Sequence, residues 1–334
     1  MDGTIALLLL QDGLTTGAIY LLLAVGLLIV FLVTRVILIP QGDFVAYGAL
    51  SLAAMLHGHV PGTLWLLDLC AVLSALVGFR TWRGLATSLA PAALITIASL
   101  LAVRLHAPAV VLGLLAVAMT ALLGPAIWRL AFRPLARASV LTLLILAMAV
   151  HYILLGIGLL LFGPEASRTP EFSSATLSVG GLDIPGHSLW VAACCVALVA
   201  GLGWMFRATM PGRALRASAS DPLGARLMGI ETDGMAKIAF LLAGGIGALA
   251  GLLIAPMTPL AYDSGFAIGL KGFIAAVIGG LASYPVAAAG ALVVGVVEAF
   301  ASFWASGYSA AIVMALLVPA LIWLSWRRRS VEEA

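Results

Sequence analysis

The sequence predicts an all-α polytopic membrane protein, a bundle of about ten or eleven transmembrane spans with one short or re-entrant helix near 268–282. Composition is the first observation behind this prediction. Of the 334 residues, 63% are hydrophobic and 9% are charged, whereas a soluble domain carries about 25% charged residues. The second observation is that the apolar residues form runs of the length that crosses a bilayer as a helix, which is about 20 residues. Lipid is an apolar solvent that accepts such surfaces, while water is not.

The candidate spans fill the chain from end to end. They cover residues 6–33, 41–58, 63–79, 84–103, 108–130, 139–162, 188–206, 235–258, 286–304 and 308–326. We interpret the first as a retained helix, because the residues before it include Asp2 but no Lys or Arg and so lack the basic start of a signal peptide. Residues 1–334 are therefore expected to form a single transmembrane domain.

The arginines indicate the orientation of the bundle, since cytoplasmic loops are enriched in Lys and Arg. They follow the first, third, fifth and seventh spans and close the chain: Arg35; Arg80 and Arg83; Arg129, Arg133 and Arg137; Arg207, Arg213, Arg216 and Arg226; and 327–329. The loop at 208–234 is therefore predicted to be cytoplasmic. The loop at 163–187, rich in Ser, Thr, Pro and Gly, is predicted to be extracytoplasmic. Arg104 is an exception, because this orientation places it outside.

The cytoplasmic loop carries the signals of a short, capped helix. Asp221 is a good N-cap, because its carboxylate can accept backbone N–H bonds, and Pro222 fits the first helical position. Gly229 stands where a glycine in left-handed conformation ends a helix. The apolar residues between them can share one face: Leu223, Leu227 and Met228. Such a helix suits docking into a partner's groove, and it equally suits a plain connection between two spans.

Few ionisable residues lie within the apolar runs: Asp43, Asp68, His151, Lys271 and Glu298. A charge in hydrocarbon costs about 2.5–3.5 kcal/mol on the insertion scale, so each should face protein or water. Lys271 and Glu298 could pair across the hairpin at 268–304. They could belong to a substrate path or gate, or they could be a structural ion pair or head groups that snorkel near a helix end. His151, taken alone, is more typical of a satisfied histidine inside a bundle than of a proton relay.

Patterns typical of enzymes, metal sites and nucleotide sites are missing from the sequence. It has no HExxH motif, no Ser/His pair or carboxylate cluster at useful spacing, and no GxxxxGK[ST] phosphate loop. Cys70, Cys194 and Cys195 lack metal-ligand spacing and are interpreted as small buried apolar residues. We predict no catalytic site, no cofactor, no metal and no nucleic-acid partner.

Four segments in the same order resemble the branched-chain amino acid permease family of bacterial ABC importers (LivH-type). Residues 12–26 read DGLTTGAIYLLLAVG, where the family has NGLxxGxxYALxALG, and 132–137 read FRPLAR, where the family has YRPLR. The third segment is GRALRASASDPLGARLMGI at 212–230. The fourth, GLKGFIAAVIGG at 269–280, continues through SYP at 283–285 to Glu298. The order makes the combination highly specific, and the segments extend over most of the chain.

The resemblance implies a permease subunit in a bacterial inner membrane. It would form half of the translocation path for branched-chain amino acids or a related small polar solute. The implied partners are a second homologous permease subunit, two cytoplasmic ATP-binding subunits, an extracytoplasmic solute-binding protein and membrane lipid. Coupling to the ATPase is implied for part of the cytoplasmic loop: Arg216, Ala217, Asp221, Gly224, Ala225, Gly229 and Ile230. A proton-coupled secondary carrier using Glu298, Lys271 or His151 stays open as the alternative, although it would have no use for a docking helix.

Two stretches depart from the family's pattern. The family's Asn-Phe-Ala-His-Gly-Glu after the first span is LIPQGD at 38–43 here. The Gly–acid pair is kept as Gly42 and Asp43, which together with Lys271 and Glu298 are the candidate residues of a translocation path or gate. Residues of about 66–103 look like an extra hairpin relative to the family's shorter members.

Overall fold

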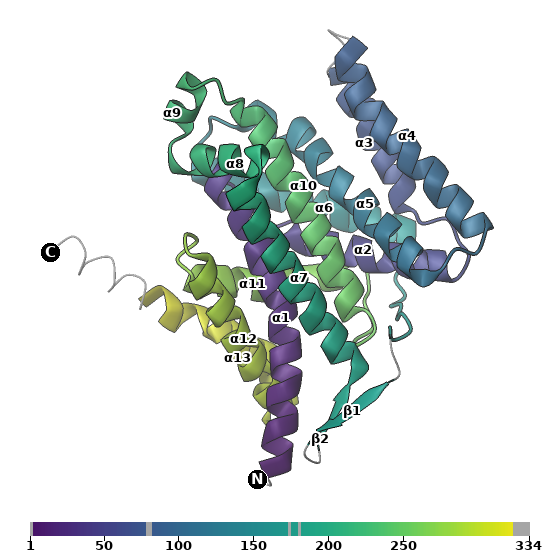
Figure 1. The fold of residues 1–334 in the computed structure, drawn as a ribbon, viewed down its shortest axis with the longest axis vertical. Coiled ribbons are helices and arrows are strands. Elements are labelled where there is room, and N and C mark those ends of the chain that lie inside the picture. The colour runs from purple at the N-terminus through teal and green to yellow at the C-terminus, as the bar shows by residue number, and fades with distance from the viewer. Residues whose placement is uncertain (1–2, 78–81, 173–174, 180–181, 323–334) are drawn as a thin grey trace, which may run out of the picture.

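The computed structural model describes residues 3–77, 82–172, 175–179 and 182–322. Its helices are α1 (Gly3–Thr34), α2 (Gln41–Leu56), α3 (Thr63–Val77), α4 (Trp82–Arg104), α5 (Ala109–Ile127), α6 (Val140–Phe162), α7 (Gly186–Ala208), α8 (Met210–Ser220), α9 (Pro222–Leu227), α10 (Thr232–Ile254), α11 (Ser264–Ile278), α12 (Tyr284–Trp304) and α13 (Ser309–Ala315). A π-helical turn (Trp128–Phe132) and a short 3-10 turn (Arg133–Leu135) extend α5, and a further 3-10 turn (Ser306–Tyr308) precedes α13. Figure 1 shows how these elements form one bundle.

Six of the helices are long and apolar enough to cross a membrane: α1, α5 with its extension to Leu135, α6, α7, α10 and α12. Shorter apolar helices cover Thr63–Leu76, Leu89–Arg104, Ser264–Ile278 and Ser306–Ile322. The polytopic helical bundle is thus confirmed, whereas the predicted number of ten or eleven spans is not.

The shorter helices explain the difference from the predicted spans. The expected span 41–58 ends as α2 at Leu56, just before Gly58, whose φ of 75° leaves the helical region. The expected span 308–326 is broken by a turn at Leu316, and its last residues lie outside the described part of the chain. The helix predicted near 268–282 is present as the 15-residue α11.

Helix α1 is the centre of the bundle and contacts α7, α10, α11 and α12. Residues 22–30 of α1 are all buried. Close approach to α12 depends on Gly17 and Gly295, because a Cβ on Gly295 would lie 2.4 Å from the backbone nitrogen of Gly17. Small residues at such crossings let membrane helices pack without a hydrophobic driving force.

The two long loops lie at opposite ends of the bundle. Helices α8 and α9 lie toward the upper end in Figure 1, and strands β1 (Thr176–Val179) and β2 (Leu182–Pro185) lie at the lower end beside the N-terminus. The arginine-rich turn after α5 belongs to the upper end as well, because the Arg133 Nε lies 3.3 Å from Asp233 Oδ1 at the start of α10. Arg80 and residues 327–329 lie outside the described residues, as does the side chain of Arg83.

The strands in the 163–187 loop were not predicted from the sequence. β1 and β2 pair antiparallel, with Leu177 opposite Ile184. The loop is also attached to the connection between α10 and α11, where Ser167 and Leu260 exchange backbone hydrogen bonds of 2.9 Å. Arg168 Nε donates to the Pro256 carbonyl oxygen over 2.8 Å. The loop is therefore a folded cap on this end of the bundle.

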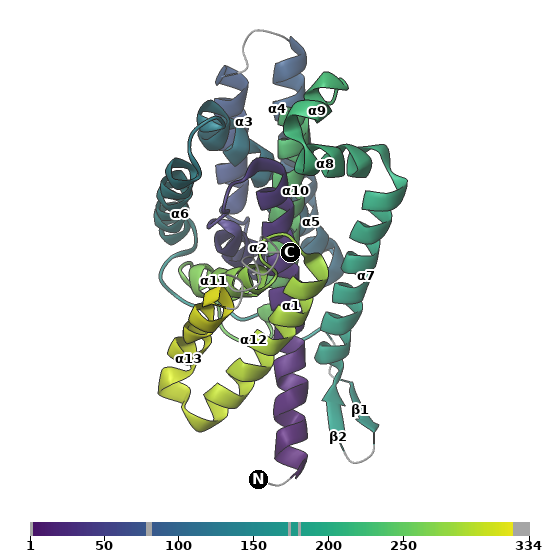
Figure 2. The same cartoon turned by 90° about the vertical axis from the view of Figure 1, so that its left-hand side faces the viewer.

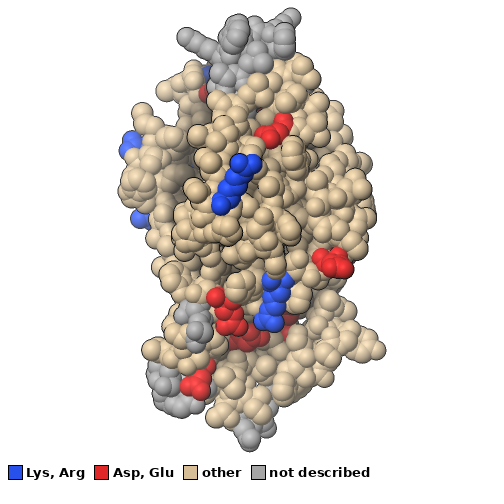
Figure 3. Space-filling view, turned by 90° about the vertical axis from the view of Figure 1, so that its right-hand side faces the viewer, with Lys and Arg blue, Asp and Glu red and all other residues tan. Residues whose placement is uncertain are grey.

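Helices α3 and α4 form a hairpin at the edge of the bundle in Figure 1, where both contact α5. This is the segment that looks like an addition to the family's pattern. Asp68 is satisfied within the hairpin, since Thr96 Oγ1 donates to its Oδ1 over 3.0 Å. Figure 3 shows one face of the molecule: most of it is free of charged side chains, and several acidic side chains gather beside a basic one in the lower half.

Candidate functional site

The capped helix predicted in the cytoplasmic loop is present as α9. Asp221 Oδ1 accepts a 3.0 Å hydrogen bond from the backbone N–H of Leu223, and Pro222 is the first helical residue. Gly229 follows the helix with a φ of 82°. The preceding helix α8 is capped in the same way, because Thr209 Oγ1 accepts from the backbone N–H of Gly212 over 3.2 Å.

The α8–α9 segment has one face against the bundle and one face in the open. Ala225 is buried, and Ala217 and Ile230 are half-buried, whereas Arg226 and three large apolar side chains at α9 are exposed. The exposed fractions of these apolar side chains are 69% for Leu223, 81% for Leu227 and 83% for Met228. An apolar cluster this exposed at the end of a bundle is typical of a docking surface for another protein.

Gly224 has an intrachain reason to be a glycine. A Cβ at this position would lie 2.5 Å from Asp221 Oδ2, so a larger side chain would displace the carboxylate that caps α9. Arg216, assigned to the same coupling segment from the sequence, lies on α8 and lines a cavity together with α7 and α12.

The predicted path residue Gly42 lies where α2 crosses α11. A Cβ on Gly42 would lie 2.2 Å from the carbonyl oxygen of Gly265, and one on Gly269 would lie 2.7 Å from the Cα of Gly42. Any side chain at these positions would separate the two short helices. Figure 2 shows α2 and α11 at mid-height in the bundle, between the α8–α9 end and the β1–β2 end. The segment that leads into α2 is also inside the protein, because Val36 and Leu38 are fully buried.

Asp43, on the first turn of α2, pairs with His151 on α6. The His151 Nδ1 lies 2.9 Å from both carboxylate oxygens, and the exposed fractions of the two side chains are 5% and 3%. The ring of Phe266 on α11 stacks on the imidazole with 4.8 Å between centroids. The sequence predicted a satisfied bundle histidine, and the structure gives Asp43 as its partner.

Lys271 and Glu298 pair as expected. The Lys271 Nζ lies 2.5 Å from Glu298 Oε1, and Tyr20 OH donates to Glu298 Oε2 over 2.6 Å. Tyr20 was missed in the sequence, where it was indistinguishable from a packing aromatic. The cluster joins α1, α11 and α12, and α11 also supplies Phe266 to the Asp43–His151 pair. Asp43 and Lys271 both lie near the crossing of α2 and α11. Among the described residues they have different partners, His151 and Glu298, and no bond joins the two pairs.

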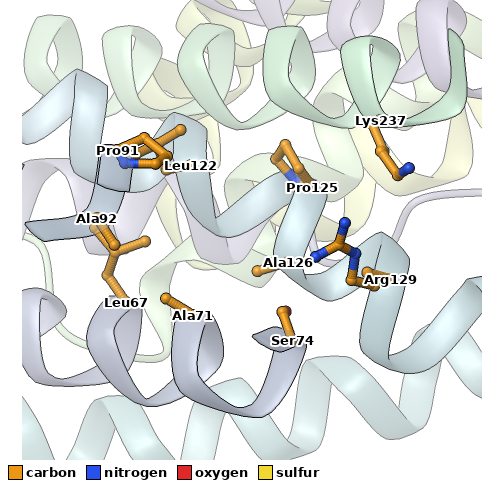
Figure 4. A pocket seen from close by; sticks show the side chains of 10 residues that line it. All are labelled: Leu67, Ala71, Ser74, Pro91, Ala92, Leu122, Pro125, Ala126, Arg129 and Lys237. Atoms are coloured by element: carbon orange, nitrogen blue, oxygen red, sulfur yellow. The ribbon is translucent and has the colours of Figure 1, made fainter. Parts of the chain in front are cut away.

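The bundle contains a cavity beside these elements and another farther from them. One of about 260 Å³ is lined by apolar residues of α6 and α11 and by the segment before α2, and Phe266 belongs to its wall. The other, of about 330 Å³, separates the α3–α4 hairpin from α5 and α10 and has Arg129 and Lys237 at one end, as Figure 4 shows. None of the path residues predicted from the sequence is among the residues that line either cavity. Among the described residues, no three His, Cys, Asp or Glu side chains gather as a metal site.

Comparison with known proteins decides the family. Residues 9–321 match the family described as "Branched-chain amino acid transport system / permease component". The chain belongs to this family. It is 31% identical to the high-affinity branched-chain amino acid transport system permease protein LivH of Salmonella typhimurium over 206 residues, which are 60% of this chain and 67% of that protein. It is 30% identical to LivH of Escherichia coli K12 over 62% of this chain and 70% of that protein.

A longer alignment links the permease to BraD of Pseudomonas aeruginosa, named as a high-affinity branched-chain amino acid transport system permease protein. The two are 25% identical over 94% of this chain and 92% of BraD. A solved structure, PsaBC from Streptococcus pneumoniae in complex with Fab, covers 95% of this chain and is covered to 90%, at 13% identity and a TM-score of 0.39. This likeness is too low to support an argument. The protein is thus a multi-pass membrane permease component of an ABC importer and not an enzyme.

Proposed function

We propose that the permease forms half of the translocation path for branched-chain amino acids or a related small polar solute, in the inner membrane of a bacterium. The names of its relatives LivH and BraD support the substrate class and the membrane. The rival mechanism, a proton-coupled carrier, receives little support from the side chains it would use. Glu298, Lys271 and His151 are each held in a close pair with an opposite or complementary group.

The complete transporter on this proposal contains a second homologous permease subunit, two cytoplasmic ATP-binding subunits and an extracytoplasmic solute-binding protein. The ATP-binding subunit docks on the α8–α9 end, and the solute-binding protein docks on the β1–β2 end. The separation of these two surfaces across the bundle supports the arrangement (Figure 1). The single domain then has a coupling loop at 208–234 and a receiving loop at 163–187.

Within the bundle, Gly42, Asp43, Lys271 and Glu298 line or gate the path. Support comes from the glycine contact between α2 and α11, since two short helices with touching backbones can move only together. Both ionisable pairs are anchored at this crossing, one through Phe266 and the other through Lys271 of α11.

The exposed apolar face of α9 carries the proposal, and it defines the test. Leu227→Glu should prevent the ATP-binding subunit from co-purifying with the permease, because a charge would be buried in the docking groove without a partner. Leu177→Glu is the matched control, since Leu177 is 51% exposed on β1 at the opposite end. Normal co-purification of the Leu227→Glu permease would show that α9 is an ordinary connecting helix.

A further inference from the structure

A cavity of about 460 Å³ lies between α1, α7, α8 and α12, and Arg216 of the proposed coupling segment is among the residues that line it. Leu21 and Val25 of α1 form its floor. Its walls come from α7, including Val199 and Gly203, and from the first residues of α12. The cavity is therefore an apolar groove along the central helix.

Two arginines stand at the α8 end of the groove. Arg207 is on the last turn of α7, and Arg216 is on α8. Within the described part of the chain, neither guanidinium has an acidic side chain at ion-pair distance. Their neighbours differ, because Arg213 donates to the Ala208 carbonyl oxygen and Arg226 donates to Thr232 Oγ1. Arg207 and Arg216 thus present two positive charges without a protein counter-ion among these residues.

The groove opens on a surface of the kind that contacts lipid. In α7 only 11% of the most apolar 18-residue stretch is buried within the protein. Trp204, which follows the lining residue Gly203 in the sequence, is 68% exposed, and an aromatic ring near the end of a span is typical of the membrane interface. We therefore expect the arginines, at the end of the α7 span, to lie near the lipid head groups, and the apolar floor to lie near the acyl chains.

We propose that this groove is a binding site for one anionic phospholipid. Arg207 and Arg216 bind the phosphate, since guanidinium forks match phosphate oxygens, and an acyl chain lies on α1 between α7 and α12. The ligand has to match both the two positive charges and the apolar cavity beside them. A free anion would leave the apolar groove unfilled. A zwitterionic lipid would place the positive charge of its own head group next to the two arginines. Because α8 leads directly into α9, the lipid would also hold the base of the proposed coupling segment.

The test uses the purified full chain in its transporter complex and measures retained phosphatidylglycerol by native mass spectrometry. We expect Arg207→Gln and Arg216→Gln each to lower retention about fivefold, as expected for the loss of one basic side chain at a lipid head group. Arg213→Gln is the matched control, because it removes the same charge from α8 without touching the groove. Phosphatidylcholine should bind weakly to all variants.

A second pair of variants tests the acyl chain without changing charge. A Cβ on Gly203 or on Gly201 would meet no atom within 4 Å, but only Gly203 lines the groove. Gly203→Phe should fill the groove and release phosphatidylglycerol, whereas Gly201→Phe should not. The proposal is overturned if both the arginine and the Gly203 variants retain the lipid as the native chain does. It is also overturned if inorganic phosphate alone displaces the lipid, or if cross-linking from position 203 reaches the second permease subunit instead of lipid.

Discussion

At the residue scale, the buried pair of Asp43 and His151 shows what one sequence cannot reveal. Both residues stood out as ionisable groups inside apolar runs, but 108 positions separate them and nothing local links them. The same limit hid the bond from Tyr20 to Glu298, which spans 278 positions. Asp221 and Gly229 were predictable, because capping depends on neighbours within the same turn of helix.

Removing one member of the Asp43–His151 pair should destabilise the permease strongly. His151→Ala leaves a buried carboxylate without its partner, and breaking such a pair costs about 3–5 kcal/mol. Thermal unfolding in detergent should therefore show a large drop in Tm for His151→Ala. The double variant Asp43→Asn, His151→Gln should recover much of this loss, because two neutral side chains need no counter-charge. A double variant as unstable as the sum of its single changes would show that the pair is not coupled.

The Lys271–Glu298 pair gives a prediction that separates the two transport mechanisms. Lys271→Met leaves Glu298 without its cation, and Glu298→Gln leaves Lys271 without its anion, so each single change should lower uptake. The double change removes both charges and should be less harmful than either one. A proton-coupled carrier that uses these residues would instead lose uptake completely in the double variant. Radiolabelled leucine uptake in cells distinguishes the two outcomes.

At the element scale, the long helices could be predicted and the short elements less well. Apolar runs of span length in a lipid environment leave the backbone no alternative to the helix, so α1, α6, α7 and α10 appear close to their expected bounds. The four-residue strands β1 and β2 are too short for alternation to be recognisable, and the composition of their loop is that of an ordinary connection. Helix ends also depend on single residues such as Gly58 and on packing, which explains the short α2.

The caps of α9 should matter for coupling more than for the stability of the bundle. Asp221→Ala removes the bond to the backbone N–H of Leu223 and should cost about 0.5–2 kcal/mol locally. The permease should keep its Tm, while ATPase stimulation by the solute-binding protein should fall. Ser220→Ala is a control next to it, since the Ser220 hydroxyl donates only to the Arg216 carbonyl oxygen within α8. Equal ATPase stimulation in the Asp221→Ala and native complexes would show that α9 does not take part in coupling.

At the scale of the whole molecule, the arginines predicted that the loops after the fifth and seventh spans face the same side of the membrane. The structure agrees, because the loops after α5 and α7 lie at one end of the bundle. Sequence periodicity could not predict that α2 and α11 cross midway through the bundle, because this crossing depends on glycine contacts between segments that are distant in the sequence. The number of spans could not be fixed either, since the shorter apolar helices have the composition of spans without the length.

The orientation of the bundle can be tested with single cysteines. Cys70, Cys194 and Cys195 are first replaced by Ala, and Ser220→Cys or Thr176→Cys is then added, since both positions are exposed. A membrane-impermeant maleimide applied to intact spheroplasts should label Thr176→Cys and should reach Ser220→Cys only after lysis. Labelling of both positions from the same side would contradict the assignment of the two loops.

On the proposed mechanism, the permease forms half of an ATP-driven translocation path and is coupled to the ATPase through α9. The most direct measurement reconstitutes the full transporter in liposomes, collapses the proton gradient with an uncoupler and follows leucine uptake with and without ATP on the ATPase side. We expect uptake that requires ATP, persists without a proton gradient and disappears with Leu227→Glu. Uptake that is driven by a pH gradient in the absence of ATP and is unaffected by Leu227→Glu would contradict it.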